Sequence, residues 1–550
     1  TTGTASLGAE SGSTLNLGTV TIGNGSTLNI TGAGTHTATN LNMTNGTTAL
    51  TLGENTALTV ASWVAETNDD TETLSLTLAA GASLNFSDTN KHRHVNQTIT
   101  VSLADNAEVT DAGVMQLSGG GLSVTGTGVY ELAGLHLSGA GSGKTTTFSI
   151  GSGATVHITG TVNDEQAEAG AFFTHNWGVR EDAPNTITID GTLILESGIS
   201  SAEGYSTTTV NSGGKLAFNR GFTSDVRKGS GRDTITVNGG GVLEVSTTNT
   251  GGANGVAVNV ADNAIVMGGN ANNTTESKIA NNLVFNGGAY IGAKAGTTLT
   301  IAPADNETGL NWLDIIGTAD TQGQAQGAGG KVVFDSAVTV TYAVKVLAGA
   351  SAEFKKGLTN QNNTYGGLTN AGLLTLGGVV QITSLSNSGR IDLAAATSLA
   401  LGDFRMTEGA TYNVGTLTGL SDTHTIGSLL GAGVGHTVTY DGTSTIRVDS
   451  HLVWDAQAAA EGDNVWNTKT TNKNWQYDAA ESAFKTDQKV IFAALDGVNT
   501  TVELGENVTA NSILLTGAFN FSVAEDSSYS LATTQGIAKE GNGSFTKVGA

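Results

Sequence analysis

Short runs of alternating apolar and polar residues recur along this chain, and each run follows a glycine and two small residues. The pattern occupies segments 12–17, 25–30, 81–86, 153–158, 296–301 and 409–414, and Gly25-Ser26-Thr27-Leu28-Asn29-Ile30 is one example. Alternation with a period of two is typical of a β-strand that buries one face. A glycine allows a sharp turn just before the strand. One such strand cannot bury its apolar face alone, so many copies must stack. The pattern therefore predicts a β-solenoid.

We expect an all-β fold, a right-handed parallel β-helix (β-solenoid) with three sides and about 20–25 residues per turn. The handedness follows from the general preference for right-handed parallel crossovers. The 550 residues would then make about 22–27 turns. The clearest repeat, from Asn370 to Asn387, is shorter, at 17 residues. The residues expected to point inward are Leu15, Leu17, Leu28, Ile30, Leu84, Phe86, Val156, Ile158, Leu299 and Ile301.

The bulk composition narrows the class of protein. The 77 glycines and only two prolines favour tight turns between strands over a disordered linker. The net charge of −24 disfavours nucleic acid and anionic membranes as partners. Cysteine is absent, so stability must come from strand pairing and stacking, and the chain suits export in an unfolded state. No apolar run is long enough for a membrane helix.

The composition changes near residue 450. Trp454, Trp466 and Trp475 lie close together, although the whole chain has six tryptophans. Together with Val490-Ile491-Phe492 and Thr501-Val502-Glu503-Leu504, they resemble the module that precedes autotransporter-associated β-strand repeats in large Gram-negative surface proteins. Residues 543–549 resemble the opening of one such repeat. We therefore expect a β-solenoid with surface loops over residues 1–450, and a Trp-containing module that continues the solenoid over residues 451–550.

The resemblance implies an autotransporter-like passenger, outside the cell at the bacterial surface or released from it. Any membrane anchor would lie outside these residues. Because Thr1 and Ala550 fall inside repeat patterns, we also expect further β-repeats beyond both ends of the chain, and end-to-end association of an isolated fragment.

Two motifs could carry ligands. Residues 138–145 (Ser-Gly-Ala-Gly-Ser-Gly-Lys-Thr) resemble a phosphate-binding P-loop, but a strand follows where a helix is needed, so we expect a turn. His92 and His94 could hold a metal together with Asp88, but Lys91 and Arg93 add positive charge, and we expect a solvated loop. No metal or cofactor site is predicted from either motif.

An acidic cluster and three irregular segments remain open. Asp69 and Asp70, with Glu66 and Glu72, could bind calcium, but an exposed acidic loop without metal is the expectation. Solenoids place binding on loops that leave the scaffold. The candidate loops are 163–184, 222–233 and 311–330, the last containing Trp312. We expect all three to be variable surface insertions without a single ligand, and a defined binding site is the alternative.

The function that we expect is non-catalytic, that of an adhesin or structural spacer whose polar faces make weak multivalent contacts with glycans or with other copies of the chain. The alternative is a secreted polysaccharide-degrading β-helix enzyme, a lyase or a glycoside hydrolase. Such an enzyme needs paired carboxylates beside a basic residue. The clean repeats show no carboxylates on neighbouring turns, so no catalytic residue is predicted.

Overall fold

The computed structural model is built of β-strands, and no helix occurs among the residues that it describes. Those residues are 3–43, 46–65, 72–138, 145–160, 172–175, 185–196, 199–202, 206–219, 223–224, 233–247, 257–269, 271, 274–280, 283–302, 310–317, 329–361, 367–387, 389–406, 411–413, 436–440, 445–450, 452–455, 464–471, 473–477, 480–493, 500–523, 527–539 and 544–547.

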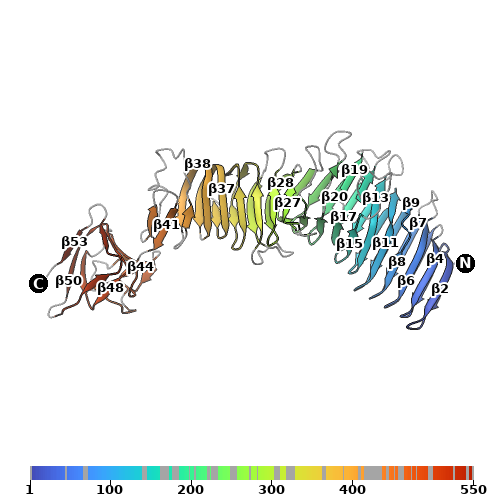
Figure 1. Cartoon of the computed structure of the whole chain (residues 1–550), viewed down its shortest axis with the longest axis horizontal. Coiled ribbons are helices and arrows are strands. Elements are labelled where there is room, and N and C mark those ends of the chain that lie inside the picture. The colour runs from blue at the N-terminus through green and yellow to red at the C-terminus, as the bar shows by residue number, and fades with distance from the viewer. Residues whose placement is uncertain are drawn as a thin grey trace. The chain divides into compact units, whose positions relative to one another are not determined.

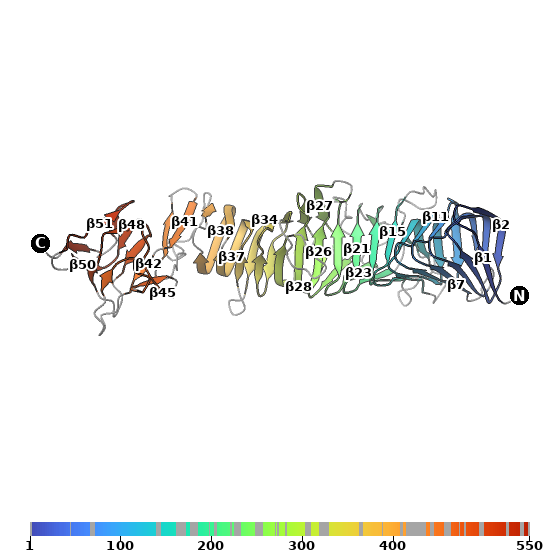
Figure 2. The same cartoon turned by 90° about the horizontal axis from the view of Figure 1, so that it is seen from below.

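The chain forms a long parallel β-solenoid of about 15 turns, which confirms the predicted fold class. It divides into two compact units, Thr1–Ile382 and Thr383–Ala550, and the solenoid is built mainly from the first. Equivalent strands of successive turns, such as β2 (Thr14–Ile22), β4 (Thr35–Met43), β6 (Ala57–Ala65) and β8 (Ser83–Phe86), lie side by side in the first unit (Figure 1), and the view from below shows the same stacking of turns (Figure 2). The number of sides and the handedness stay predictions.

Strands of the first unit pair in columns, each strand with its equivalent one turn later. The first column contains β1 (Thr4–Gly8), β3 (Ser26–Thr31), β5 (Thr47–Leu52), β7 (Glu72–Leu78), β10 (Gln97–Leu103), β12 (Gly121–Gly126), β14 (Thr147–Ile150), β17 (Asn185–Ile189), β20 (Ser206–Val210), β23 (Asp233–Val237), β25 (Ala257–Ala261) and β28 (Leu283–Ala293). The second contains β2 (Thr14–Ile22), β4 (Thr35–Met43), β6 (Ala57–Ala65), β8 (Ser83–Phe86), β11 (Glu108–Ser118), β13 (Val129–Ser138), β15 (Thr155–Ile158), β18 (Thr192–Leu195), β21 (Lys215–Phe218), β24 (Val242–Val245), β26 (Ala264–Gly268), the end of β28, β30 (Leu310–Ile316), β33 (Val344–Val346) and β36 (Leu368–Asn370).

The remaining strands of the first unit form further parallel pairings, with β11, β13 and β30 or with one another. They are β9 (Lys91–Val95), β16 (Phe172–His175), β19 (Ile199–Ala202), β22 (Thr223–Ser224), β27 (Glu276–Ile279), β29 (Thr298–Ile301), β31 (Lys331–Phe334), β32 (Val338–Val340), β34 (Ser351–Phe354), β35 (Gly357–Asn360) and β37 (Leu373–Asn387).

Equivalent apolar residues stack into continuous buried ladders. One ladder of the first column pairs Leu28, Leu50, Leu76, Val101, Val124, Ile150, Ile189, Val210, Val237, Val260 and Phe285 in register, and all are buried. Burying apolar area is the main driving force available to such a chain. The predicted inward residues from Leu28 to Ile301 are buried as expected. Leu15 and Leu17 are only half-buried, because β2 pairs with just one neighbouring strand, β4.

The predicted turn length is confirmed where turns are regular, but the predicted number of turns is wrong. Lys331 pairs with Ser351 and Thr4 with Thr27, which gives turns of 20 and 23 residues. One turn is far longer, because His157 and Glu196, which face each other on adjacent turns, are 39 residues apart. Long insertions of this kind consume residues without adding turns, so the solenoid has about 15 turns rather than 22–27.

The second unit contains two groups of strands. The first group is β38 (Arg390–Met406), β39 (Thr411–Asn413), β40 (His436–Tyr440) and β41 (Thr445–Ser450), in which β41 pairs antiparallel with both β39 and β40. The second group is β42 (Leu452–Trp454), β43 (Val465–Trp466), β44 (Trp475–Tyr477), β45 (Ala480–Ser482), β46 (Val490–Phe492), β47 (Thr501–Leu504), β48 (Val508–Ala510), β49 (Ile513–Leu515), β50 (Ala518–Val523), β51 (Leu531–Thr533), β52 (Ile537–Lys539) and β53 (Ser544–Lys547).

The second group is a short parallel stack with its own aromatic core. Its columns run β42–β46–β49–β52, β43–β47–β50–β53 and β48–β51, and the antiparallel hairpin β44–β45 adds to β42. Trp454, Trp466 and Trp475 are all buried. Trp475 packs edge to face with both other tryptophans, Trp466 packs in the same way on Phe484, and Trp475 on Phe492. The strand pairing thus changes at residue 450, where the domain boundary was predicted, although the compact units divide after Ile382.

Candidate functional site

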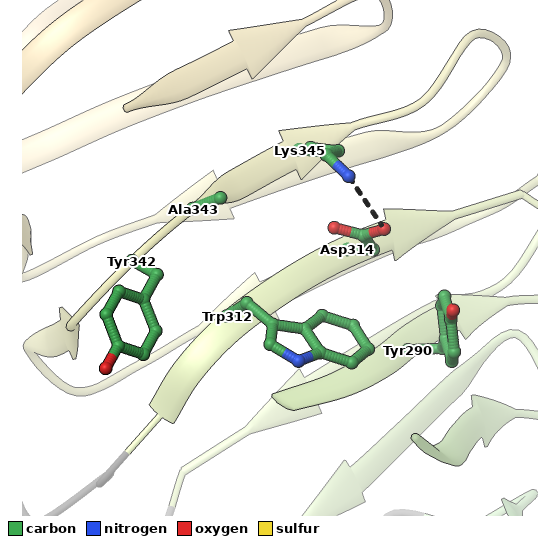
Figure 3. A pocket seen from close by; sticks show the side chains of 6 residues that line it. All are labelled: Tyr290, Trp312, Asp314, Tyr342, Ala343 and Lys345. Carbon is green, nitrogen blue, oxygen red and sulfur yellow. Dashed lines mark ion pairs between the residues drawn. The ribbon is translucent and has the colours of Figure 1, made fainter. Parts of the chain in front are cut away.

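A groove opens in the first unit where the number of residues between paired strand segments grows from turn to turn. In β28, one residue, Gly288, separates the paired positions 287 and 289. Two residues, 311 and 312, occupy the equivalent place in β30. Three residues, 341–343, occupy it between β32 and β33 on the next turn. Each added residue pushes the backbone outward, as a β-bulge does. The result is a cavity of about 520 Å³, which we name the corner groove (Figure 3); it is lined by Tyr290, Trp312, Asp314, Tyr342, Ala343 and Lys345.

The indole of Trp312 is held in place before any ligand arrives. It lies on the bare backbone of Gly288, where a Cβ atom would come within 1.8 Å of the indole Cε2. Its Nε1 donates a hydrogen bond of 3.1 Å to Oδ1 of Asp262, which also accepts the Gly288 amide at 2.8 Å. The ring of Tyr290 packs edge to face on the indole, with 5.1 Å between centroids. A side chain fixed in this way loses little entropy on binding.

The same register position on three successive turns supplies the polar side chains Tyr290, Asp314 and Lys345 of the corner groove. Tyr290 pairs with Asp314, and Asp314 pairs with Lys345. The Lys345 ammonium lies 3.8 Å from Oδ2 of Asp314, whereas Oδ1 is buried and accepts no hydrogen bond from the described residues. Burial raises the pKa of Asp314 above its ordinary value, although Lys345 acts in the opposite direction. Burial is the main cause that raises the pKa of Tyr290, and the negative charges of Asp314 and Asp262 raise it further. The Tyr290 phenol therefore stays protonated at neutral pH.

This arrangement suits recognition better than acid–base chemistry. Aromatic rings offer flat apolar surfaces, and the phenols and charged groups offer hydrogen bonds at their edges. Tyr342 is 38% exposed, so part of the aromatic surface is open to solvent. Among the described lining residues only Asp314 is a carboxylate, whereas glycosidases use two. The corner groove therefore resembles a binding site.

Trp312 was singled out in the sequence as part of the candidate loop 311–330, but the structure places it on strand β30. Asp314 also falls within that candidate loop, of which residues 318–328 lie outside the described part of the chain, but it was not singled out. Sequence reasoning missed Tyr290, Tyr342 and Lys345, since their approach depends on register between distant segments. Of the other two candidate loops, 163–184 and 222–233, the greater part lies outside the described residues.

The expectation of a solvated loop at the histidine pair is wrong for His94. His94 lies on β9, is fully buried, packs on Trp63, and its Nδ1 lies 2.7 Å from Oε1 of Gln97. The side chain of His92 lies outside the described residues. Asp88 accepts hydrogen bonds from Ser62 and Asn90. In the described part of the chain, no three His, Asp or Glu side chains form a group suited to a metal.

The expectation of an exposed acidic loop is wrong for Glu72. This residue begins β7, is buried, and accepts a hydrogen bond from the Gln97 side chain. Glu66, Asp69 and Asp70 lie outside the described residues, and so does most of the P-loop-like segment, 139–144.

Two carboxylates contact one histidine from the turns before and after it, an arrangement that the sequence did not reveal. The ring of His157 lies between Glu131, 3.4 Å from Nδ1, and Glu196, 3.1 Å from Nε2. Glu196 also accepts a hydrogen bond of 2.7 Å from Asn219. Glu131 and His157 pair in register on β13 and β15, a relation that becomes visible only when the turn length is known.

The fold defines the class of this protein as a parallel β-solenoid. No protein-family description, no curated protein and no solved structure matches the chain. The described residues include no helix with the length and hydrophobicity needed to cross a membrane.

Proposed function

We propose that this chain is a non-catalytic, extracellular binding solenoid that contacts glycans through the corner groove. The observation that carries the proposal is the fixed indole of Trp312, flanked by Tyr290 and Tyr342 on a rigid stack of strands. Sugar rings present apolar C–H faces and a rim of hydroxyls, which match an aromatic surface with polar edges. One such contact is weak, and display of many copies would add avidity.

We further propose that the chain is an autotransporter-like passenger, displayed on a bacterial surface or released from it, and that it acts as an adhesin or a structural spacer. The support is the resemblance of residues 454–504 and 543–549 to autotransporter-associated modules, together with the absence of cysteine and the acidic charge. A solenoid suits display because each turn contacts only its neighbours, so its length can grow without a new core.

Self-association remains part of the proposal. In the second unit, β53 pairs with β50, and the apolar residues Phe545 and Ile537 are 41% and 50% exposed. Strand edges and apolar surface of this kind favour docking of another strand. Sedimentation velocity across a concentration series should show larger species at higher protein concentration, and Phe545→Lys should reduce them. A monomer at every concentration would contradict self-association.

An enzyme that degrades polysaccharides is the second candidate, and Glu131 and Glu196 beside His157 favour it. Here one carboxyl group could activate water while another donates a proton. Both carboxylates are already engaged with the His157 ring, which argues for a structural role. Release of reducing sugar that Glu131→Gln abolishes would establish the enzyme.

The test of the proposed function is a glycan array probed with the purified chain and two variants. Trp312→Ala should abolish the binding that the unaltered chain shows. Tyr529→Ala is the matched control, because Tyr529 is 39% exposed but lies outside the corner groove. No binding by the unaltered chain, or equal binding by Trp312→Ala, would contradict the proposal.

A further inference from the structure

We propose that the corner groove selects uncharged glycans and rejects those carrying carboxylates. This inference rests on the proposed function and adds the class of ligand. The corner groove joins three aromatic side chains to the ion pair Asp314–Lys345, and Asp262 accepts a hydrogen bond from the indole Nε1. Nothing in that set is a free cation that could receive an acidic sugar.

The charges around the corner groove oppose an anionic ligand. Asp262 and Asp314 supply two negative charges, and Lys345, the one cation among the described lining residues, lies against Asp314. A sugar carboxylate would have to draw Lys345 away from Asp314. The Asp314 side chain is only 13% exposed, so it would be left largely buried without its counter-charge. Such an uncompensated buried charge is strongly unfavourable.

The remaining surface suits a short neutral oligosaccharide. The lining side chains come from three successive turns, β28, β30 and β33 with the segment before it. Two strand spacings amount to about 10 Å along the solenoid axis, which is room for about two sugar rings. Trp312 lies in the middle, with Tyr290 on the preceding turn and Tyr342 on the following one (Figure 3). Hydroxyl groups of a sugar can bond to Asp314 or Lys345 without breaking their ion pair.

The experiment measures affinity by calorimetry for neutral hexose oligosaccharides and for oligosaccharides of equal length that carry uronic or sialic acid. The unaltered chain should bind the neutral set, with affinity that changes little between about 0.01 and 1 M salt, and should not bind the acidic set. Asp314→Asn frees Lys345 and should raise affinity for the acidic set at least about tenfold, while Asp314→Asn with Lys345→Met should remove that gain.

The outcomes separate this inference from the proposed function. Binding of acidic glycans in preference to neutral ones by the unaltered chain would overturn the inference and leave glycan binding intact. Unchanged selectivity in Asp314→Asn, with circular dichroism like that of the unaltered chain, would also overturn it. If Asp314→Asn does not fold, the salt dependence and glycan selectivity of the unaltered chain decide. Failure to bind either set would overturn the proposed function, and the inference with it.

Discussion

A single methyl group added at Gly288 should disorganise the corner groove. In Gly288→Ala the new Cβ would lie 1.8 Å from Cε2 and 2.0 Å from Nε1 of Trp312, distances that no packed structure contains. The obstructing group is a rigid bicyclic ring, so it cannot move aside by bending at its tip. The indole must therefore leave the position in which it contacts Asp262 and Tyr290.

The cost follows from the contacts that are lost. The hydrogen bond from Nε1 to Asp262 involves a charged acceptor, for which about 1.5 kcal/mol is a suitable value, since Asp262 is exposed. The edge-to-face contact with Tyr290 contributes about 0.5–1.5 kcal/mol. Alanine restricts the unfolded chain and returns about 0.4–1 kcal/mol. We therefore expect Gly288→Ala to lower the free energy of unfolding by about 1–2.6 kcal/mol, and to abolish glycan binding as Trp312→Ala should.

Urea unfolding followed by circular dichroism measures the stability, and acrylamide quenching of tryptophan fluorescence reports the release of the indole. The combined variant Gly288→Ala with Trp312→Phe identifies the contribution of this tryptophan. Gly18→Ala is the matched control, because a Cβ there would meet no atom within 4 Å. If Gly288→Ala matches Gly18→Ala in stability and quenching, the packing of Trp312 on Gly288 is not what holds the indole.

Three further substitutions test the buried contacts of the two units. His36 is buried, neither of its ring nitrogens is hydrogen-bonded to a described residue, and burial lowers its pKa below the ordinary 6.5. The unfolded chain therefore binds the proton first as the pH falls, so stability should decrease below about pH 6.5. His36→Leu should lessen that loss, measured as the urea midpoint at each pH. Burial raises the pKa of Glu244, but the ammonium groups of Lys215 and Lys294, at 2.6 and 2.7 Å, outweigh burial and lower it. The stabilisation by Glu244 is therefore present above pH 4.5, its ordinary pKa, and is lost as the pH falls further. Glu244→Gln should lower the free energy of unfolding by about 1–3 kcal/mol at neutral pH, and a smaller decrease in urea unfolding would contradict the argument. Trp466→Ala should lower the free energy of unfolding by about 3–5 kcal/mol. The near-ultraviolet circular dichroism of the tryptophan cluster should be lost in this variant, and an unchanged spectrum would show that this core is not needed.

The interior of the solenoid could be predicted because it depends on local pattern. Alternation along a single strand decides which residues face inward, and Ile30, Phe86, Val156 and Ile301 are all buried. The repeat at Asn370 and Asn387 also reflects a local rule, since each side chain accepts a hydrogen bond from the glycine amide two residues later, at 3.2 Å.

The buried polar residues could not be predicted in the same way. His94 and Glu72 lie within polar stretches of sequence, and Gln97 supplies a buried partner to each, from three residues along the chain for His94 and from the adjoining turn for Glu72. A polar side chain enters a core when its hydrogen bonds are met there. Whether they are met depends on which residue lies one turn away, and insertions change that distance along this chain.

The corner groove shows the same division most clearly. The sequence alone predicted a stack of parallel strands with an apolar interior, because period-two alternation and glycine turns are properties of neighbouring residues. The tertiary structure alone decided that one, two and then three residues occupy the corner on successive turns, and that Trp312 lies on Gly288. Register between segments 23 to 31 residues apart controls that arrangement. Such a register is set by the packing of whole turns against one another, which no short stretch of sequence contains.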